Sequence, residues 1–276
     1  MTVLPLVAAL ISGLAAAPTK IVMREARGEV LIEDLVFKTS LDDWVAAYRV
    51  SSTATKPAPA IMFVHWLETS QPTSNRSQFL DEAIELAKRG SVTSLLIETM
   101  WSQPDWFAHR DPAKDRDATD RQLKRVKEAL DLLLESPNID PRRVAYVGHD
   151  FGGMAGAVLS KTERRVQFWA IQAATARWHE WYLLGRKLPP EGRKQAAEAT
   201  AAIDPVLTIA DAKGSFLFQF GSQDSYVPRR IAEEFYAAAP DPKQILWYDA
   251  GHGLNDQAKL DRIAWLARNL KFGPIQ

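Results

Sequence analysis

The chain has 276 residues, of which 46% are hydrophobic and 25% are charged, as in ordinary globular proteins. This balance argues against a disordered chain, which needs low hydrophobicity and high net charge. Lys and Arg together number 34, and so do Asp and Glu, so the sequence lacks the basic excess typical of nucleic-acid-binding proteins. The sequence contains no Cys, which excludes disulfides, thiolate nucleophiles and zinc–thiolate sites.

Residues 1–17 form a short apolar segment that ends in Ala15-Ala16-Ala17-Pro18. This pattern resembles the apolar core and the cleavage zone of a signal peptide, which predicts export to a periplasm or out of the cell. The alternative is a buried or frayed N-terminal helix, because no Lys or Arg precedes Lys20. A membrane span needs about 20 apolar residues, so we expect no span in the mature chain.

From residue 28 to residue 276, short apolar runs alternate with helical patterns. Strands are predicted at residues 30–38, 44–50, 60–64, 92–97, 144–147, 166–171, 215–220 and 244–248. Helices are predicted at residues 77–89, 118–135, 152–160, 229–239 and 256–270. Strands that alternate with helices predict one α/β domain, with a mostly parallel eight-stranded sheet covered by helices on both faces.

One connection is much longer than the others. About 40 residues separate the strand ending near Ala173 from the strand beginning near Ser215, whereas most connections have about 2–6. The segment contains Trp178, Trp181 and Tyr182, followed by a polar, Ala-rich stretch. We expect a lid over a site, at about residues 174–210, in which the three rings form the core of the lid or line a pocket.

The stretch Gly148-His149-Asp150-Phe151-Gly152-Gly153 follows a predicted strand and precedes a helix of small residues. A reactive side chain on such a turn stands out from the sheet, and the flanking glycines allow the tight backbone path. The turn also places the N–H of Phe151 at a helix N-terminus, where negative charge is favoured. The sequence therefore predicts a nucleophile elbow at Asp150. A plain turn residue that caps the helix is the alternative.

Three further features follow other predicted strands. Asp224 lies in Gly221-Ser222-Gln223-Asp224, and His252 lies in Asp249-Ala250-Gly251-His252. The order nucleophile, acid, histidine is one of the known orders of a catalytic triad. His65-Trp66 follows the strand at 60–64, where a second oxyanion N–H is expected, from Trp66 or from Leu67. A turn Asp and an exposed loop His are the plain alternatives, but four matches in the right order favour a site.

On these motifs, residues 28–270 resemble the α/β-hydrolase superfamily. The frame around Asp224 and His252, together with Asp140-Pro141-Arg142-Arg143-Val144, resembles the dienelactone-hydrolase and peptidase-like esterase branch. Gly148-His149-Asp150 is similar to the elbow of epoxide hydrolases and of haloalkane or haloacetate dehalogenases. That resemblance implies that Asp150 attacks, Asp224 orients and His252 is the base. It also implies that the oxyanion hole of Phe151 with Trp66 or Leu67 acts when water attacks the covalent intermediate.

The sequence departs from these families at three positions. Trp66 replaces the glycine that usually follows the strand-end histidine, and its indole N–H is an alternative donor to a leaving group. Phe151 stands where the Asp-nucleophile families often carry Trp. Epoxide hydrolases use two lid tyrosines as acids, and Tyr182 is the one clear candidate here.

The segment after the strand at 92–97 supplies the remaining candidates. Trp101, Trp106 and Phe107 are expected to line an apolar substrate pocket. Arg110 is a candidate for holding a substrate carboxylate, although a surface ion pair with Asp105 or Asp111 is the interpretation that base rates favour. Asp, Glu and His do not cluster with metal-ligand spacing, so we expect neither a metal nor a cofactor.

Taken together, the sequence predicts a hydrolase acting on a small apolar substrate and water, with an epoxide or a carbon–halogen bond favoured by the nucleophile type. The alternative activity is hydrolysis of a carboxylic ester or lactone. A non-catalytic ligand-binding protein is the alternative from another class. A fold alone does not decide among them, because this fold hosts many chemistries.

Overall fold

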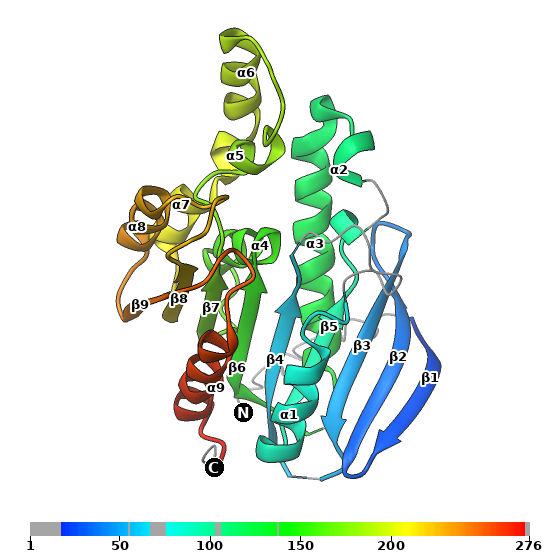
Figure 1. Cartoon of the computed structure of the whole chain (residues 1–276). Coiled ribbons are helices and arrows are strands. Elements are labelled where there is room, and N and C mark those ends of the chain that lie inside the picture. The colour runs from blue at the N-terminus through cyan, green and yellow to red at the C-terminus, as the bar shows by residue number, and fades with distance from the viewer. Residues whose placement is uncertain (1–17, 55, 67–75, 103–105, 137, 274–276) are drawn as a thin grey trace, which may run out of the picture.

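The structure, a computed structural model, describes residues 18–54, 56–66, 76–102, 106–136 and 138–273. The described residues form one sheet of nine strands in the order β1-β2-β3-β5-β4-β6-β7-β8-β9 (Figure 1). The strands are β1 (Thr19–Arg27), β2 (Val30–Lys38), β3 (Trp44–Ser52), β4 (Ala58–Val64), β5 (Thr93–Ile97), β6 (Ile139–His149), β7 (Phe168–Gln172), β8 (Ser215–Gly221) and β9 (Lys243–Tyr248).

The sheet is mixed, with its antiparallel part at one edge. The pairs β1–β2, β2–β3 and β3–β5 are antiparallel. The pairs β5–β4, β4–β6, β6–β7, β7–β8 and β8–β9 are parallel. The carboxyl ends of the parallel strands therefore share one edge, where sites in such sheets gather. Of the predicted site residues, those that follow β4, β6 and β8 stand at this edge.

Helices cover both faces of the sheet. They are α1 (Leu80–Gly90), α2 (Trp106–His109), α3 (Asp115–Leu134), α4 (Phe151–Ser160), α5 (Trp178–Tyr182), α6 (Pro190–Thr200), α7 (Pro205–Thr208), α8 (Arg229–Ala238) and α9 (Asp256–Leu270), besides short 3-10 turns. α9 begins where the Asn255 side chain accepts a hydrogen bond from the Ala258 N–H at 3.1 Å, as N-capping residues do.

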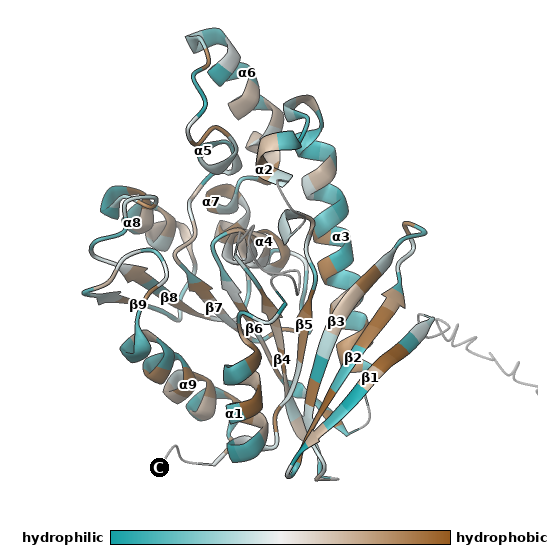
Figure 2. Ribbon diagram, turned by 45° about the vertical axis from the view of Figure 1, so that its right-hand side comes forward, coloured by the Kyte–Doolittle hydropathy of each residue, from teal (hydrophilic) through white to brown (hydrophobic). Residues whose placement is uncertain are grey.

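Two apolar cores lie on opposite faces of the sheet. Side chains alternate along β4, so that Ile61 and Phe63 join the core under α1 and α9, while Met62 and Val64 join the core under α3, α4 and α8. This is the period-two alternation of a strand buried on both faces. Figure 2 shows the result as mostly brown central strands between helices whose outer faces are largely teal.

The structure adds a strand that the sequence did not predict. β1 pairs with β2 and makes the sheet nine-stranded rather than eight-stranded. Its side chains are nearly all exposed, and Val22 and Met23 are more than half exposed. An edge strand with no buried face lacks the alternation from which strands are recognised. The fold class is otherwise as predicted.

The long connection between β7 and β8 folds into α5, α6, α7 and short turns. Figure 1 shows α5 and α6 standing beyond the carboxyl edge of the sheet, above α4. Whether this segment opens and closes as a lid stays a prediction. Within the described residues, no helix combines the length and the apolar composition needed to cross a membrane. The predicted signal segment, residues 1–17, lies outside the described residues.

Candidate active site

The turn between β6 and α4 has a backbone that few side chains tolerate. Asp150 has φ 55° and ψ −120°, a region that glycine favours, and it directly precedes the first residue of α4. A Cβ on Gly148 would lie 2.3 Å from the Gly152 carbonyl oxygen, and one on Gly152 would lie 2.1 Å from the Val64 carbonyl oxygen. Gly148 is therefore required for the strand and helix of the turn to approach each other, and Gly152 for the turn to pack against β4. This is the elbow that the sequence predicts.

The elbow brings the three predicted triad residues together. The Nδ1 atom of His252 lies 2.8 Å from Oδ2 of Asp224, which is hydrogen-bonding distance. Nε2 of His252 lies 3.7 Å from Oδ2 of Asp150. Asp224 is held in turn, because its Oδ1 accepts hydrogen bonds from the backbone N–H groups of Tyr226 at 2.7 Å and Val227 at 3.0 Å. The roles of the three residues stay predictions.

The two carboxylates set the protonation of the histidine between them. Burial opposes the charged form of His252, but the interactions with Asp150 and Asp224 outweigh burial and raise the pKa of His252 to about 9. Burial likewise opposes the charge of Asp224, but the contact with His252 outweighs it and lowers the pKa of Asp224. At neutral pH, His252 is therefore an imidazolium flanked by carboxylates.

The predicted oxyanion donors are placed differently from one another. The N–H of Phe151 is the first of α4, and the first N–H groups of a helix have no partner within the helix. The N–H of Trp66 donates to Oε1 of Gln78 at 3.1 Å, so in this structure it is already engaged. Leu67 lies outside the described residues. The helix position of the Phe151 N–H agrees with the predicted oxyanion role, whereas the Trp66 N–H would first have to leave Gln78.

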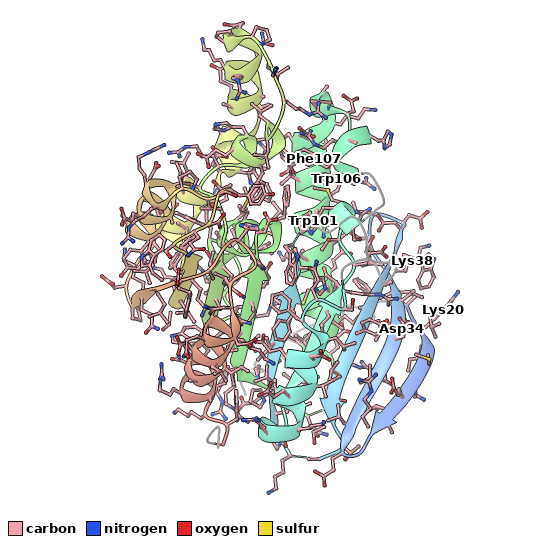
Figure 3. The ribbon with its side chains drawn as sticks, viewed as in Figure 1. Lys20, Asp34, Lys38, Trp101, Trp106 and Phe107 are labelled. Atoms are coloured by element: carbon pink, nitrogen blue, oxygen red, sulfur yellow. The ribbon has the colours of Figure 1, made fainter. Side chains whose placement is uncertain are left out.

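The predicted pocket residues form a cluster of rings around Phe151, which we call the aromatic flank. The ring of Phe151 is fully buried. Its centroid lies 5.2–6.2 Å from those of Trp101, Trp106, Trp178, Trp181 and Tyr182. Figure 3 shows Trp101, Trp106 and Phe107 following one another along the segment beside α3. The rings are packed together, and whether they also line a substrate pocket stays a prediction.

Several members of the aromatic flank are fixed by hydrogen bonds. Nε1 of Trp101 donates to the His65 carbonyl at 3.2 Å, and Nε1 of Trp178 donates to the Ile203 carbonyl at 2.8 Å. The Tyr182 hydroxyl pairs with Oγ1 of Thr119 at 2.6 Å. Nε1 of Trp181 is buried and has no hydrogen-bond partner among the described residues, although the ring lies 5.3 Å from that of His252.

Arg110 is committed to the protein rather than facing open space. Its Nη1 donates to Oδ1 of Asp115 at 2.6 Å, and its Nη2 donates to the carbonyl oxygen of Tyr182. Its cation lies 5.0 Å from the centroid of Phe107 and 4.8 Å from that of Tyr182. The predicted ion pair is present, but with Asp115 instead of Asp111, while Asp105 lies outside the described residues. Arg110 therefore ties α2 and α3 to α5.

Two site residues were not singled out by the sequence. The half-exposed ring of Tyr226 lies edge-on to His252, with ring centroids 5.2 Å apart. His149, which directly precedes Asp150 in sequence, places Nε2 2.9 Å from the His252 carbonyl oxygen. Tyr226 follows Asp224 closely in sequence, and that proximity is the signal that could have found it. The contact of His149 with a backbone atom has no sequence signature.

A buried polar network lies behind the elbow on the face covered by α1 and α9. Nε of Arg262 donates to Oε1 of Glu82 at 2.9 Å, and its Nη1 donates to Oε1 of Gln172 at 2.7 Å and to Oε1 of Gln219 at 3.0 Å. The Gln172 carbonyl accepts the Asp150 N–H at 2.9 Å. The network therefore supports Asp150 through its backbone. No group of three or more Asp, Glu or His side chains in the described part of the chain could hold a metal ion.

No protein-family model matches the chain, and no curated protein matches its sequence. Solved structures do resemble it. An acetyl xylan esterase from Paenibacillus sp. R4 aligns with a TM-score of 0.72 at 15% identity, over 92% of this chain and 88% of that one. A putative dienelactone hydrolase from Klebsiella pneumoniae has a TM-score of 0.64 at 13% identity, over 88% and 99% of the two chains. A cold-adapted esterase from an Arctic intertidal metagenomic library has a TM-score of 0.64 at 12% identity, over 90% and 97%.

Proposed function

Because the chain has the α/β-hydrolase fold, we propose that it is a hydrolase in which Asp150 is the nucleophile and His252 activates water. The substrate is a small apolar molecule with an electrophilic saturated carbon, either an epoxide or a carbon–halogen bond. The observation that carries the proposal is the geometry at the elbow, where a strained, buried Asp150 lies 3.7 Å from an imidazolium oriented by Asp224.

The resting charges suit a carboxylate nucleophile. A serine in the same position would need a neutral histidine to take its proton, whereas the raised pKa of His252 keeps that histidine protonated at neutral pH. An ionised carboxylate needs no base before it attacks. The pair of Asp150 carboxylate and His252 imidazolium is therefore ready for the first step as it stands.

In the first step, an Asp150 oxygen forms a bond to the substrate carbon while the bond to the leaving group breaks. A halide departs as the anion, and an epoxide oxygen departs as an alkoxide that remains part of the substrate. His252 then loses its proton, to solvent or to the alkoxide. Because the new ester on Asp150 carries no charge, the attraction that raised the pKa of His252 is weakened.

In the second step, neutral His252 takes a proton from water, and the resulting hydroxide attacks the carboxyl carbon of Asp150. The Phe151 N–H stabilises the oxyanion that forms there, and one such donor is worth about 3–4 kcal/mol. The bond between this carbon and the oxygen that links it to the substrate breaks, so the alcohol departs with an oxygen that came from Asp150, and His252 protonates it. The acid proton left on Asp150 passes to His252, which restores the resting ion pair.

The buried indole of Trp181 supports a leaving group that carries negative charge. Its Nε1–H has no partner among the described residues, and an unmade hydrogen bond of a buried donor costs about 1–3 kcal/mol. A halide or an alkoxide that accepted this hydrogen bond would gain stabilisation at the moment the charge develops. The adjacent ring of Phe151 makes the same place apolar.

Hydrolysis of an ester or lactone is the second candidate, because two of the three similar structures reported above are described as esterases and the third as a putative dienelactone hydrolase. Attack of Asp150 on an acyl carbon would give an anhydride rather than an alkyl ester. The two activities therefore leave adducts of different composition on the same residue.

The test is the intact mass of the His252→Gln variant after incubation with pooled epoxides, haloalkanes, haloacids, esters and lactones. Without the base the second step stalls, so an adduct is expected to accumulate on Asp150. The double variant with Asp150→Asn is the matched control and should carry no adduct. An alkyl adduct supports the epoxide or halide activity, and an acyl adduct supports the ester activity.

A second measurement uses a single turnover of the wild-type chain in water enriched in oxygen-18. If Asp150 attacks carbon, the first alcohol product takes its oxygen from the carboxylate and carries no label. Label in the first product would mean that water attacks the substrate directly. Ligand binding without turnover, unchanged in Asp150→Asn, would instead support the non-catalytic alternative.

A further inference from the structure

We propose that His149 is a positioning residue, which holds the backbone of the His252 loop and thereby sets the separation of His252 and Asp150. This inference rests on the proposed function for its kinetic consequence, but its structural part can be tested without any substrate. His149 precedes the nucleophile in sequence and belongs to β6. It therefore joins the strand that carries Asp150 to the loop that carries His252.

The contact is a hydrogen bond with a defined direction. Nε2 of His149 lies 2.9 Å from the carbonyl oxygen of His252. A carbonyl oxygen can only accept, so Nε2 carries the proton and donates. The side chain of His252 is fixed separately, through Nδ1 and Asp224. One bond thus orients the ring of His252, and the other fixes the backbone from which the ring projects.

His149 is a neutral donor. Burial, together with the nearby charge of His252, lowers the pKa of His149 to about 3, so it carries no charge at neutral pH. A second cation at a ring distance of 5.2 Å would repel the His252 imidazolium. A neutral imidazole supplies the hydrogen bond without that repulsion.

Packing alone does not hold the His252 loop. Gly251 and Gly253 flank the histidine, and a Cβ added to either would meet nothing within 4 Å. Gly253 and Leu254 border a cavity of about 290 Å³ that His149, Trp66 and Arg262 also line. Before His252, the loop packs on β8, because a Cβ added to Gly221 would lie 2.3 Å from the Ala250 carbonyl oxygen. From Gly253 onward it borders the open cavity, so the position of His252 depends on this packing and on hydrogen bonds.

The ring of His149 is itself held firmly. Its centroid lies 4.7 Å from that of Trp66, whose ring is packed edge-on against Phe79 at 5.5 Å. His149 is almost fully buried, and its backbone pairs with Gln172 of β7. A side chain fixed by a sheet and by neighbouring rings is a suitable second anchor for the loop, besides its packing on Gly221.

The groups that face His252 are few. Asp150 and Asp224 are the charged ones. The rings of Tyr226 and of Trp181 from α5 lie edge-on to His252, and His149 faces it from β6. Arg262 on α9 acts on His149, whose charged form it disfavours. Since His149 is neutral, removing it changes the position of His252 rather than the charge around it. A shift in the pKa of His252 therefore reports a change in its distance from Asp150.

Two substitutions separate the hydrogen bond from the ring. His149→Phe keeps a ring of similar size and removes the donor, whereas His149→Gln keeps an N–H at the same distance along the side chain. His149→Met, which is flexible and has no donor, replaces His149→Phe if that variant does not fold. Cooperative thermal unfolding establishes which variants are folded.

The first readout is the pKa of His252 by NMR of the folded variants, without substrate. His149→Phe is expected to lower this pKa from about 9 toward the ordinary value of 6.5, because Nε2 moves away from Asp150. His149→Gln is expected to keep it high. An unchanged pKa in a folded His149→Phe or His149→Met variant would overturn the inference, whatever the activity of the chain.

The second readout separates the two chemical steps with a substrate that forms the adduct. His149→Phe should form the adduct on Asp150 at nearly the wild-type rate, since the carboxylate needs no base. Hydrolysis of the adduct should be slower by about 100-fold, the size expected for a misplacement of about 1 Å. His149→Gln should restore most of the loss. Equal slowing of both steps would indicate a general structural defect and contradict a positioning role.

The two proposals fail in different ways. If the wild-type chain forms no adduct but the pKa of His252 falls in His149→Phe, the proposed function is wrong and the positioning role stands. If the wild-type chain forms the adduct and His149→Phe hydrolyses it at the wild-type rate, the proposed function stands and the positioning role is wrong.

Discussion

Asp150 stands between two flanks that differ in kind. On the polar flank, His149, His252, Asp224 and the network of Arg262 and Glu82 are joined by directed hydrogen bonds. On the aromatic flank, the Phe151 ring is surrounded by indole and phenol rings. The polar atoms of Trp101, Trp178 and Tyr182 bond to backbone carbonyls or to Thr119, away from Asp150. One flank holds charges at set distances, and the other excludes water beside them.

The comparison shows why a buried carboxylate is tolerated at the elbow. Burial of an isolated charge is costly, and the cost falls only when a partner charge and hydrogen bonds accompany it. The polar flank supplies the cation of His252, and the aromatic flank lowers the dielectric around the pair, which strengthens their attraction. Three substitutions and one pH dependence test this division between the polar flank and the aromatic flank.

The largest effect is expected when the polar flank loses the orienting carboxylate. Asp224→Asn removes the charge that stabilises the His252 cation and fixes its Nδ1 proton, so turnover should fall by about 10⁴-fold. NMR should show a lower pKa for His252. Asp249→Asn, on the neighbouring loop, is the matched control and should leave both quantities close to wild type. A loss below tenfold in Asp224→Asn would mean that Asp224 does not orient the base.

The buried ion pair behind the elbow gives the next effect, on stability. Arg262→Met leaves Glu82 as a buried charge without its partner, which should cost about 3–5 kcal/mol in the free energy of unfolding. The double variant Glu82→Leu/Arg262→Met should recover most of that loss. Urea denaturation measures both. A single variant as stable as the double one would show that the pair contributes no coupling.

The aromatic flank should respond as a packed core. Phe151→Ala removes a fully buried ring among five others and leaves a cavity, at a cost of about 3–5 kcal/mol, less where the neighbouring rings collapse inward. The pKa of His252 should stay near its wild-type value, because no polar contact is lost. A large fall in that pKa would show that the two flanks are not separable.

The smallest expected effect is the pH dependence of stability. The folded pKa of His252, about 9, lies above the ordinary value of 6.5, so the folded state binds this proton more tightly. The resulting stability is fully present below pH 6.5 and is lost as the pH rises through 9. Tm should therefore fall across this window in the wild type and less in His252→Gln. Equal slopes in the two chains would contradict the raised pKa.

Much of the fold could be predicted because buried strands leave a plain signal. Ala60–Val64 is an uninterrupted apolar run, and the strands beside it in the sheet also contain apolar runs. β1 was not predicted from the sequence, because an exposed edge strand needs no apolar face. The proximity of Asp150, Asp224 and His252 could be predicted for a different reason, since all three follow strands whose carboxyl ends must meet at one edge.

The finer geometry of the site could not be predicted, because it depends on contacts that residue types do not encode. His149 bonds a backbone carbonyl, which every residue possesses. Several acidic residues lie near Arg110 in sequence. In the structure its ion pair is with Asp115, the first residue of α3. The rings predicted to line a pocket are packed around Phe151, whose inward direction follows from the elbow and not from the pattern of apolar residues.

The backbone conformation of Asp150 affects which substitutions the chain tolerates at this position. Its φ of 55° and ψ of −120° cost a side-chain-bearing residue about 1–3 kcal/mol relative to glycine. Any residue other than glycine bears a similar backbone cost at this position, so an exchange of Asp for Ser would leave that cost unchanged while it removes the carboxylate beside His252. Replacement of Asp150 by glycine would relieve this backbone cost, but it would also remove one of the two carboxylates beside the buried His252. The gain in backbone energy would therefore be offset by the loss of an ionic contact.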